Sequence, residues 1–389
     1  MTIFSPWPVL LITVCCLALG WGIFASSGFF RARVTEVNDN RFEMLDGLRG
    51  FLALGVFFVH VATTYVYYTE GRWDSSSARF QSFVGAAGVS LFFMITGFLF
   101  WLRVLRSRAS LDAKTLYISR LRRLVPMYAA SVMMVVTIVA VMSGFSLHGN
   151  VTSLLHELRP WLSFGFMATG DVNGVKDAYM INAVYWTLAF EWAFYVALPF
   201  LALFARGPWC AGLFAGVLFF GTQTPIVLNF LFGALAALAV DRQWLRGQLR
   251  PAWLVPLPIA ALACVFLLFD TVYALAPAAL LFVFFLFVID GNSLSGILSC
   301  SPAKLLGTVS YSVYLNHCIV LFVTMRVVNA VIPIGELAPL QYWSFAALAA
   351  LAAVALSAVT YRYIEYPFMV PQQRAQRPAV APLGRAHAL

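Results

Sequence analysis

Apolar runs of about twenty residues recur along almost the whole chain, and they leave few folds open to it. A run of this length can cross the hydrocarbon core of a bilayer as an α-helix, because a helix satisfies its own backbone hydrogen bonds. Only 11% of the residues are charged, against about 25% in soluble domains. We therefore predict an all-α, polytopic transmembrane helical bundle. The candidate spans are 8–30, 46–68, 82–102, 124–145, 183–205, 208–221, 222–240, 252–270, 272–290, 305–330 and 341–364.

The positive charges are distributed unevenly around these spans. Cytoplasmic loops of membrane proteins carry an excess of Lys and Arg, and this bias sets the orientation. With the N-terminus outside, all but five of the 25 Lys and Arg residues fall inside, the exceptions being Arg72, Arg79, Arg159, Lys176 and Arg326. We therefore predict that the N-terminus lies outside and the C-terminus in the cytoplasm. The net charge of +9 then reflects topology, and we expect no nucleic-acid partner.

The cysteines give no sign of a metal centre. The six cysteines occur without a CxxC spacing, so the sequence indicates neither a zinc site nor a disulfide framework. We interpret them as small apolar residues and predict no bound metal.

Arg49 and His60 lie inside a predicted span, where charged or titratable side chains are costly. The interval between them turns an α-helix through roughly 1100°, three turns plus about 20°, so both side chains leave the same face about 16 Å apart along the axis. Such groups face a protein interior or a wet cavity, and by default they indicate function. Asp46 lies one turn before Arg49, and we expect the two to pair as structural support for the arginine.

Two further titratable residues are predicted at the depth of His60. With the orientation above, helix rise puts His60 about 21 Å, His317 about 18 Å and Glu191 about 20 Å from the inner boundary of the bilayer core. We therefore predict that the three side chains converge on one cavity. The alternative is that these polar residues hydrogen-bond between helices for packing alone. The polar stripes that contain them are Thr187, Glu191 and Tyr195 on one helix, and Ser310, Tyr314 and His317 on another.

A dense group of basic residues spans 103–123. Because the planar guanidinium suits bidentate phosphate contacts, Arg103, Arg120 and Arg123 are candidates to hold a polyphosphate at the mouth of the cavity. The alternatives are plain positive-inside topology and contact with anionic lipids. Glu365, near the inner end of the last span, is expected to be a structural partner for a cytoplasmic arginine.

Six sequence motifs, taken in order, resemble those of the membrane acyltransferase 3 family. The resemblance covers roughly residues 41–370, and one position departs from it, since Thr96 stands where serine is usual. The motifs are the segment 41–50 with Arg49 followed by ten residues and His60; 88–98; Arg120 and Arg123 before Pro126; 185–188 with Glu191, Tyr195 and Pro199; 306–315 with His317; and 364–367 with Glu365.

The resemblance implies a ten-helix core in a bacterial inner membrane that transfers an acyl group, most often acetyl from acetyl-CoA, to a hydroxyl of a carbohydrate or cell-envelope glycan. The span 8–30 lies outside that core as one extra N-terminal transmembrane helix. We therefore divide the chain into this helix with a cytoplasmic linker (1–40), a membrane acyltransferase domain (41–370) and a disordered cytoplasmic tail (371–389). Because the chain ends shortly after Pro367, we expect no appended SGNH-type domain of the kind that some relatives carry.

The residues and the resemblance together predict a mechanism. Cytoplasmic acyl-CoA is expected as a co-substrate, with no permanently bound cofactor, its phosphates on the arginines and its pantetheine arm along the Arg49 face towards His60. His60 is expected to act as general base on the acceptor hydroxyl. His317 or Glu191 would orient it or bind the acceptor, with Tyr314 as structural support. Transient acylation of His60 is the alternative.

The main rival function is a transporter or flippase of an anionic or glycosylated solute. Transporters usually show internal repeats, and the sequence shows none. The sequence leaves open the acceptor, the acyl chain length and the oligomeric state.

Overall fold

The computed structural model describes residues 3–38, 42–107, 112–205, 208–222 and 224–369, and its helices contain all the regular secondary structure of these ranges. An isolated bridge between Val172 and Val175 is the only extended pairing in this part of the chain. The prediction of an all-α bundle is therefore confirmed. The predicted tail, 371–389, lies outside the described residues.

The helices follow the apolar runs in order. The α-helices are α1 (Trp7–Ser26), α2 (Gly28–Asn38), α3 (Glu43–Glu70), α4 (Arg79–Arg106), α5 (Ala113–Met142), α6 (Val151–Leu158), α7 (Trp186–Ala202), α8 (Pro208–Gly221), α9 (Pro225–Asp241), α10 (Pro256–Leu268), α11 (Leu275–Ile289), α12 (Ser301–Thr308), α13 (Ser310–Val331) and α14 (Pro339–Thr360). Short 3₁₀ turns are η1 (Pro160–Leu162), η2 (Ala178–Asn182), η3 (Ala252–Leu254) and η4 (Ile334–Glu336), and α14 continues as a π-helical turn, η5 (Tyr361–Glu365).

Six helices of the described chain are long and apolar enough to cross a membrane, namely α1, α3, α4, α5, α13 and the segment Pro339–Met369 that contains α14. Shorter apolar helices accompany them at Trp186–Ala202, Pro225–Asp241, Ala252–Leu268 and Leu275–Ile289. The apolar runs therefore located these helices, although α5 begins at Ala113 and not at the predicted 124. This earlier start places Arg120 and Arg123 inside the helix.

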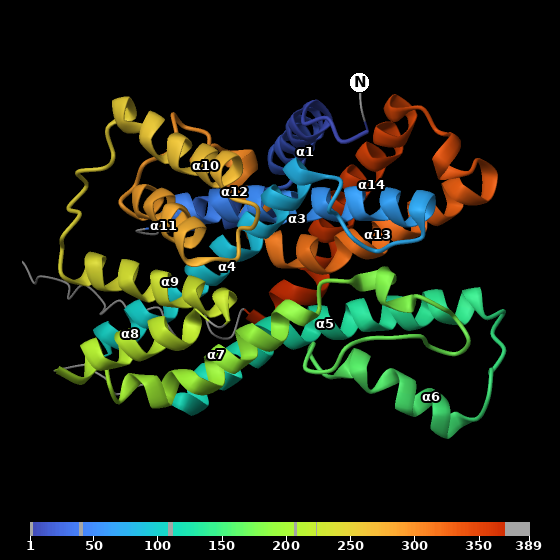
Figure 1. Ribbon diagram of the computed structural model, residues 1–389, viewed down its shortest axis with the longest axis horizontal. Coiled ribbons are helices and arrows are strands. Elements are labelled where there is room, and N and C mark those ends of the chain that lie inside the picture. The colour runs from blue at the N-terminus through green and yellow to red at the C-terminus, as the bar shows by residue number, and fades with distance from the viewer. Residues whose placement is uncertain (1–2, 39–41, 108–111, 206–207, 223, 370–389) are drawn as a thin grey trace, which may run out of the picture.

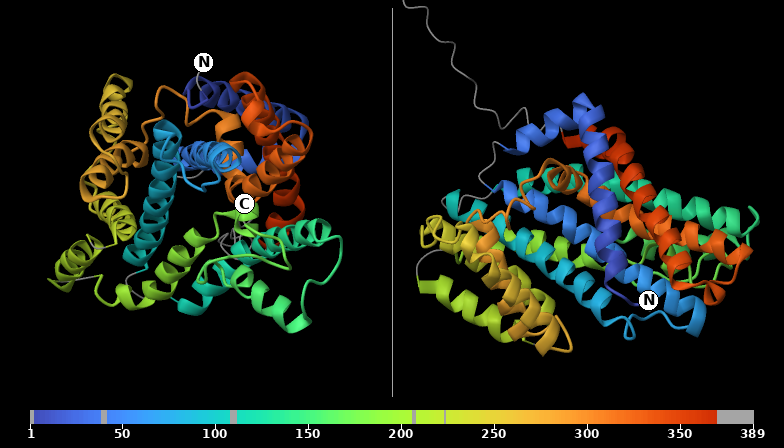
Figure 2. Two further views of the ribbon diagram at one scale, coloured as in Figure 1. Left: turned by 45° about the vertical axis from the view of Figure 1, so that its right-hand side comes forward. Right: turned by 90° about the horizontal axis from the view of Figure 1, so that it is seen from above.

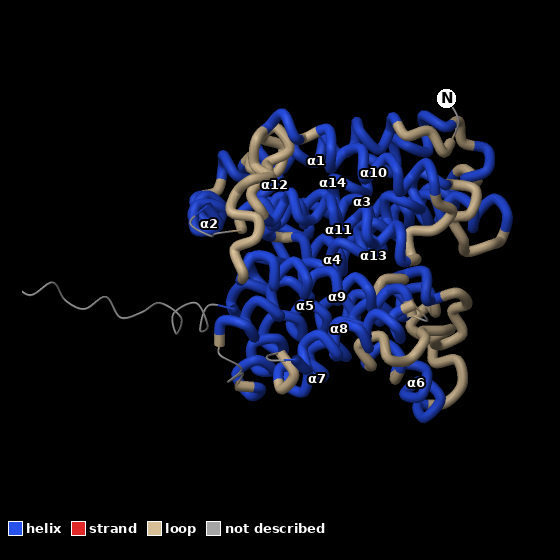
Figure 3. The backbone as a smooth tube through the Cα atoms, turned by 60° about the vertical axis from the view of Figure 1, so that its left-hand side comes forward, coloured by secondary structure: helices blue, strands red, loops and turns tan. Residues whose placement is uncertain are grey.

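α3 and α4 lie in the middle of the bundle and contribute about half of the residues that line the site. In Figure 1, α1 and α10 lie above them and α5, α7 and α8 below, and Figure 3 shows the same order from another side. α3 packs against α4, α12 and α13, and α4 also packs against α9. α1 packs against α12 and α14, beside which it runs in Figure 2. Only 22% of the apolar window of α1 is buried, against 72% for α3, as expected for a helix added to the outside of a core.

The predicted span 305–330 is wrong in one respect, because the structure breaks it into α12 and α13. Val309 has ψ 7° between the two helices. α12 is held separately by close backbone contact with the start of α3, where a Cβ on Gly307 would lie 1.6 Å from the Asp46 carbonyl oxygen. On the facing helix, a Cβ on Gly47 would lie 1.9 Å from the Leu298 carbonyl oxygen. Glycines on both sides therefore permit this contact.

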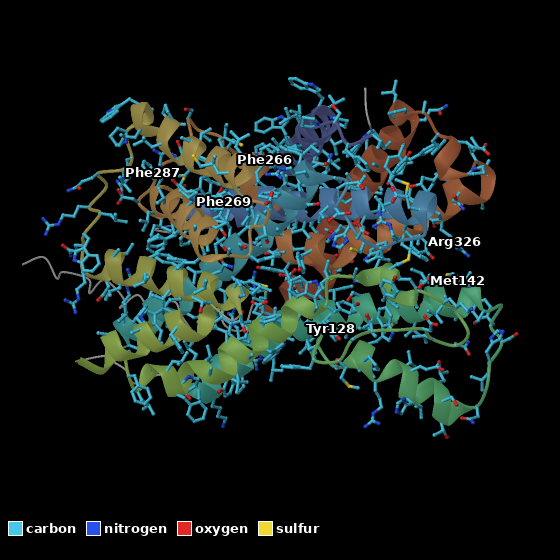
Figure 4. All side chains as sticks on the ribbon, in the orientation of Figure 1. Tyr128, Met142, Phe266, Phe269, Phe287 and Arg326 are labelled. Carbon is cyan, nitrogen blue, oxygen red and sulfur yellow. The ribbon has the colours of Figure 1, made fainter. Side chains whose placement is uncertain are left out.

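Arg79 joins the beginning of α4 to the end of α10. Its Nη2 donates to the carbonyl oxygens of Phe266 at 3.0 Å and Phe269 at 2.9 Å, and its Nη1 lies 3.2 Å from Asp270 Oδ1. The guanidinium satisfies carbonyls that the end of a helix leaves without partners. Figure 4 labels Phe266 and Phe269 on this segment. The contact fixes the loop after α10, which forms part of the site.

Candidate active site

The first feature of the site is a cavity of about 350 Å³ that contains the four predicted arginines. Arg49 comes from α3, Arg103 from α4, and Arg120 and Arg123 from α5. The sequence predicted that these residues would share one site, and the structure brings them together. We call this space the arginine cavity. Its other polar lining residues are Thr96, Thr187, Glu191, Tyr195, Ser310, Tyr311 and Tyr314.

The guanidinium groups in the arginine cavity have few anionic partners. Arg49 Nη1 lies 3.7 Å from Asp46 Oδ1, the pair expected from their spacing. Arg103, Arg120 and Arg123 belong to none of the ion pairs formed within 4.0 Å by the described residues. The charges of Glu365 and Glu191 act on Arg123, but none of these three arginines has a carboxylate of the described chain within 4.0 Å, an arrangement that favours an anionic ligand.

Arg120 is held by aromatic rings. Its Cζ lies 4.9 Å from the ring centroid of Phe100 and 5.8 Å from that of Tyr195, both within cation–π range. Arg120 Nη2 donates to Ser119 Oγ at 3.2 Å, while Nε is buried and has no hydrogen-bond partner among the described residues. The aromatic rings therefore position the guanidinium and leave at least one donor unused.

Glu191 belongs to the arginine cavity and not to the histidines. Its carboxylate accepts a hydrogen bond from Tyr195 Oη, one turn along α7, and it lines the same space as Arg120 and Arg123. The predicted convergence of Glu191 with His60 and His317 is wrong in this respect. Glu191 shares its cavity with Arg49 and not with His60, so the depth predicted from helix rise did not identify its neighbours.

A second cavity of about 340 Å³ contains His60. We call it the histidine cavity. It is bordered by α3, α4, the loop after α10 and the segment before α7, with Asp270 and Tyr273 among its polar residues. Trp73, from the loop after α3, stacks on His60 with ring centroids 6.3 Å apart. The sequence reasoning missed Trp73, because nothing in the pattern shows that this loop folds back over the helix.

Val89 and Tyr314 line both cavities and form the wall between them. Tyr314 Oη and Thr187 Oγ1 are hydrogen-bonded at 2.7 Å, and the ring of Phe92 meets that of Tyr314 edge to face at 6.1 Å. Tyr314 was predicted to be structural support for the site, and the structure places it in the wall between the two cavities. One layer of side chains separates the space around the arginines from the space around His60.

His60 and His317 are neighbours, as their predicted depths required. Their ring centroids are 5.4 Å apart, and His317 is fully buried. His317 Nδ1 lies 3.1 Å from the Val313 carbonyl oxygen, and its Nε2 lies 3.3 Å from Cys318 Sγ. The sequence reasoning missed Cys318, although its position directly after His317 was visible.

Glu365 lies close enough to Arg123 and Arg49 for their charges to act on it, and its direct hydrogen-bond partner is a serine. Ser312 Oγ donates to Glu365 Oε2 at 2.9 Å, and Glu365 is fully buried. The ion pairs of the described residues do not include it. Its hydrogen bond joins the end of the last helix to α13, because the π-helical turn η5 directs the side chain inward.

The long apolar helices are those of an integral membrane protein, and two neighbouring cavities with polar side chains lie among them. Residues 42–362 match the family model described as an acyltransferase domain. The chain belongs to this family, acyltransferase 3, as its motifs predicted, and is an acyltransferase. This membership favours an enzyme over the transporter or flippase considered from the sequence.

Curated relatives extend over most of the chain. The exopolysaccharide production protein ExoZ of Rhizobium meliloti is 28% identical over 78% of this chain and 95% of its own length. Nodulation protein 10 of Rhizobium leguminosarum bv. viciae is 26% identical over 83% of this chain and 92% of its own length. The peptidoglycan O-acetyltransferase OatA of Listeria monocytogenes is 25% identical over 86% of this chain and 57% of its own length. No solved structure matches the chain.

Proposed function

We propose that this protein transfers an acyl group, acetyl by default, from cytoplasmic acyl-CoA to a hydroxyl of a carbohydrate or cell-envelope glycan. The observation that carries the proposal is the pair of cavities on either side of Val89 and Tyr314. One is lined by arginines that suit the phosphates of a donor, and the other contains a histidine that suits an acceptor hydroxyl. Relatives named for exopolysaccharide production and for peptidoglycan O-acetylation support a glycan acceptor.

The donor is held in the arginine cavity as a co-substrate and not as a permanent cofactor. Arg103, Arg120 and Arg123 bind its phosphates, and the thioester end extends towards Tyr314. A charged donor cannot enter from the hydrocarbon, so the cavity receives it from the cytoplasm. This requires the orientation predicted from the charges, in a bacterial inner membrane, with the N-terminus outside and the C-terminus in the cytoplasm.

His60 acts on the acceptor in the histidine cavity. It accepts the proton of the acceptor hydroxyl while that oxygen attacks the thioester carbonyl; the C–S bond breaks, CoA leaves as a thiolate, and His60 gives the proton back to that thiolate. His317 packs against the ring of His60 and holds it in position. The carbonyl must meet the hydroxyl across the wall, so the hydrogen bond between Tyr314 and Thr187 opens during transfer.

The experiment that tests the proposal is transfer of radiolabelled acetyl from acetyl-CoA to cell-envelope glycan by the purified protein in detergent or liposomes. We expect His60→Ala to reduce the rate by about 10²- to 10⁴-fold, the usual contribution of a general base. His156→Ala is the matched control, because His156 is exposed on α6. Normal transfer by His60→Ala would remove His60 from the mechanism. A wild-type protein that acetylates no glycan would contradict the function itself.

A further inference from the structure

His60, His317 and Cys318 form a cluster between α3 and α13. Each offers one ligand atom, a ring nitrogen or the sulfur, and these atoms lie within 4.8 Å of one another. His317 and Cys318 are buried. The proposed function assigns a role to each of the two histidines and none to Cys318.

His317 is already arranged as a metal ligand. Its Nδ1 lies 3.1 Å from the Val313 carbonyl oxygen, a bond that requires the proton to be on Nδ1. Nε2 therefore carries the lone pair, and it faces Cys318 Sγ at 3.3 Å. A backbone carbonyl that fixes the tautomer in this way is a common outer partner of metal-binding histidines.

His60 and Cys318 border a hole of about 10 Å³, close to the space of a single water molecule. His60 Nδ1 is buried and has no hydrogen-bond partner among the described residues. Because buried polar atoms are nearly always paired, this ring nitrogen is available to a ligand that enters the hole.

We propose that His60, His317 and Cys318 bind one Zn²⁺ ion. Two imidazoles and a thiolate are ligands that zinc accepts, whereas Mg²⁺ and Ca²⁺ require oxygen. Zinc bonds of about 2.0–2.3 Å at tetrahedral angles separate ligand atoms by about 3.4–3.6 Å. The atoms of His317 and Cys318 are near that spacing, and the widest pair in the cluster has to close by roughly 1 Å. Binding breaks the S–H bond of Cys318, forms a Zn–S bond and releases the thiol proton to solvent.

Zinc at this site inhibits acyl transfer, a consequence that rests on the proposed function. A neutral imidazole has one nitrogen with a free lone pair, and the other carries hydrogen. When the ion occupies the lone pair of His60, that side chain can no longer accept the proton of the acceptor hydroxyl. The ion also links α3 to α13 beside the wall formed by Val89 and Tyr314.

The binding is tested on the purified full-length protein with Co²⁺ as a spectroscopic substitute for zinc. We expect one ion per chain and a thiolate-to-cobalt charge-transfer band. Cys318→Ser should abolish the band, whereas Cys264→Ser, on α10 away from the cluster, should retain it. Elution as a single folded peak in size-exclusion chromatography controls for folding. A wild-type spectrum without the band, or a band that persists in Cys318→Ser, would overturn the site.

The inhibition is tested separately. Cys318→Ser should keep the wild-type transfer rate after treatment with a chelator, and its sensitivity to added Zn²⁺ should fall by about tenfold or more, the scale on which ligand-shell changes alter metal affinity. Equal zinc sensitivity in the two proteins would disprove inhibition through this cluster. If neither protein transfers acetyl in chelated buffer, the proposed function fails while the cobalt spectra still decide the metal site.

Discussion

At the residue scale, the arginine cavity depends on how single guanidinium groups are held. Phe100 and Tyr195 support the face of Arg120 and leave its Nε free of partners in the described chain. Lysine would keep the charge at this position, but it has neither the planar face that stacks on aromatic rings nor the fork that matches a phosphate. In the proposed function, this arrangement suits an arginine that binds the donor, and the alternative is an arginine that only contributes to topology.

We predict that Arg120→Lys weakens the binding of CoA by about tenfold or more, the loss of roughly one charge-assisted hydrogen bond. Equilibrium dialysis of radiolabelled CoA against the purified protein measures the change. Arg122→Lys is the matched control, since Arg122 is exposed on the same helix and lines neither cavity. If the two variants bind CoA with equal affinity, the charge of Arg120 contributes only to the orientation of the protein in the membrane.

At the element scale, the contact between α3 and α12 places the beginning of the helix that carries Arg49 and His60. No side chain fits between Gly307 and the Asp46 carbonyl oxygen, so the two backbones touch. α13 begins after the break at Val309 and carries His317, whose ring centroid lies 5.4 Å from that of His60. The position of the histidine pair therefore depends on a glycine contact at the other end of α3.

We predict that Gly307→Ala lowers the free energy of unfolding by about 1–3 kcal/mol, the usual cost of overpacking, because the new Cβ meets backbone and not a movable side chain. Thermal unfolding in detergent, followed by size-exclusion chromatography, measures the loss. Gly22→Ala on α1 should be tolerated, since a Cβ at Gly22 has nothing within 4 Å. A Gly307→Ala protein as stable as Gly22→Ala would contradict the close contact.

At the scale of the whole molecule, the sequence predicted the helical class, the positions of most helices and the four arginines that line one cavity. The length of the apolar runs and the distribution of the charged residues predict these features because the bilayer constrains both. The break at Val309 was not predicted, since the apolar run continues through it and only the packing of α12 on α3 separates the helices. Glu191 was assigned to the wrong neighbours, because a depth counted along one helix does not show which side chains of other helices it meets. The role of Cys318 depends on a tertiary contact that its spacing from other cysteines does not show.

The orientation of the bundle also gives a prediction at this scale. In a background without the native cysteines, Arg159→Cys should react with a membrane-impermeant maleimide added to intact cells, and Arg106→Cys should react only after the cells are opened. Both residues are exposed, Arg106 at the end of α4 and Arg159 just after α6. The reverse pattern would place the arginine cavity on the outside and exclude a cytoplasmic donor.

The wall formed by Val89 and Tyr314 has a consequence for the electrical insulation of the membrane. A bundle with a polar space on each side of one residue layer is insulating only where that layer is intact, because ions cross water-filled paths far more easily than hydrocarbon. Chemistry across the layer therefore has to pass a small acyl group without ever connecting the two aqueous spaces. Under the proposed function, a cell could transfer acyl groups to glycan outside the membrane and retain both its coenzyme A and its proton gradient.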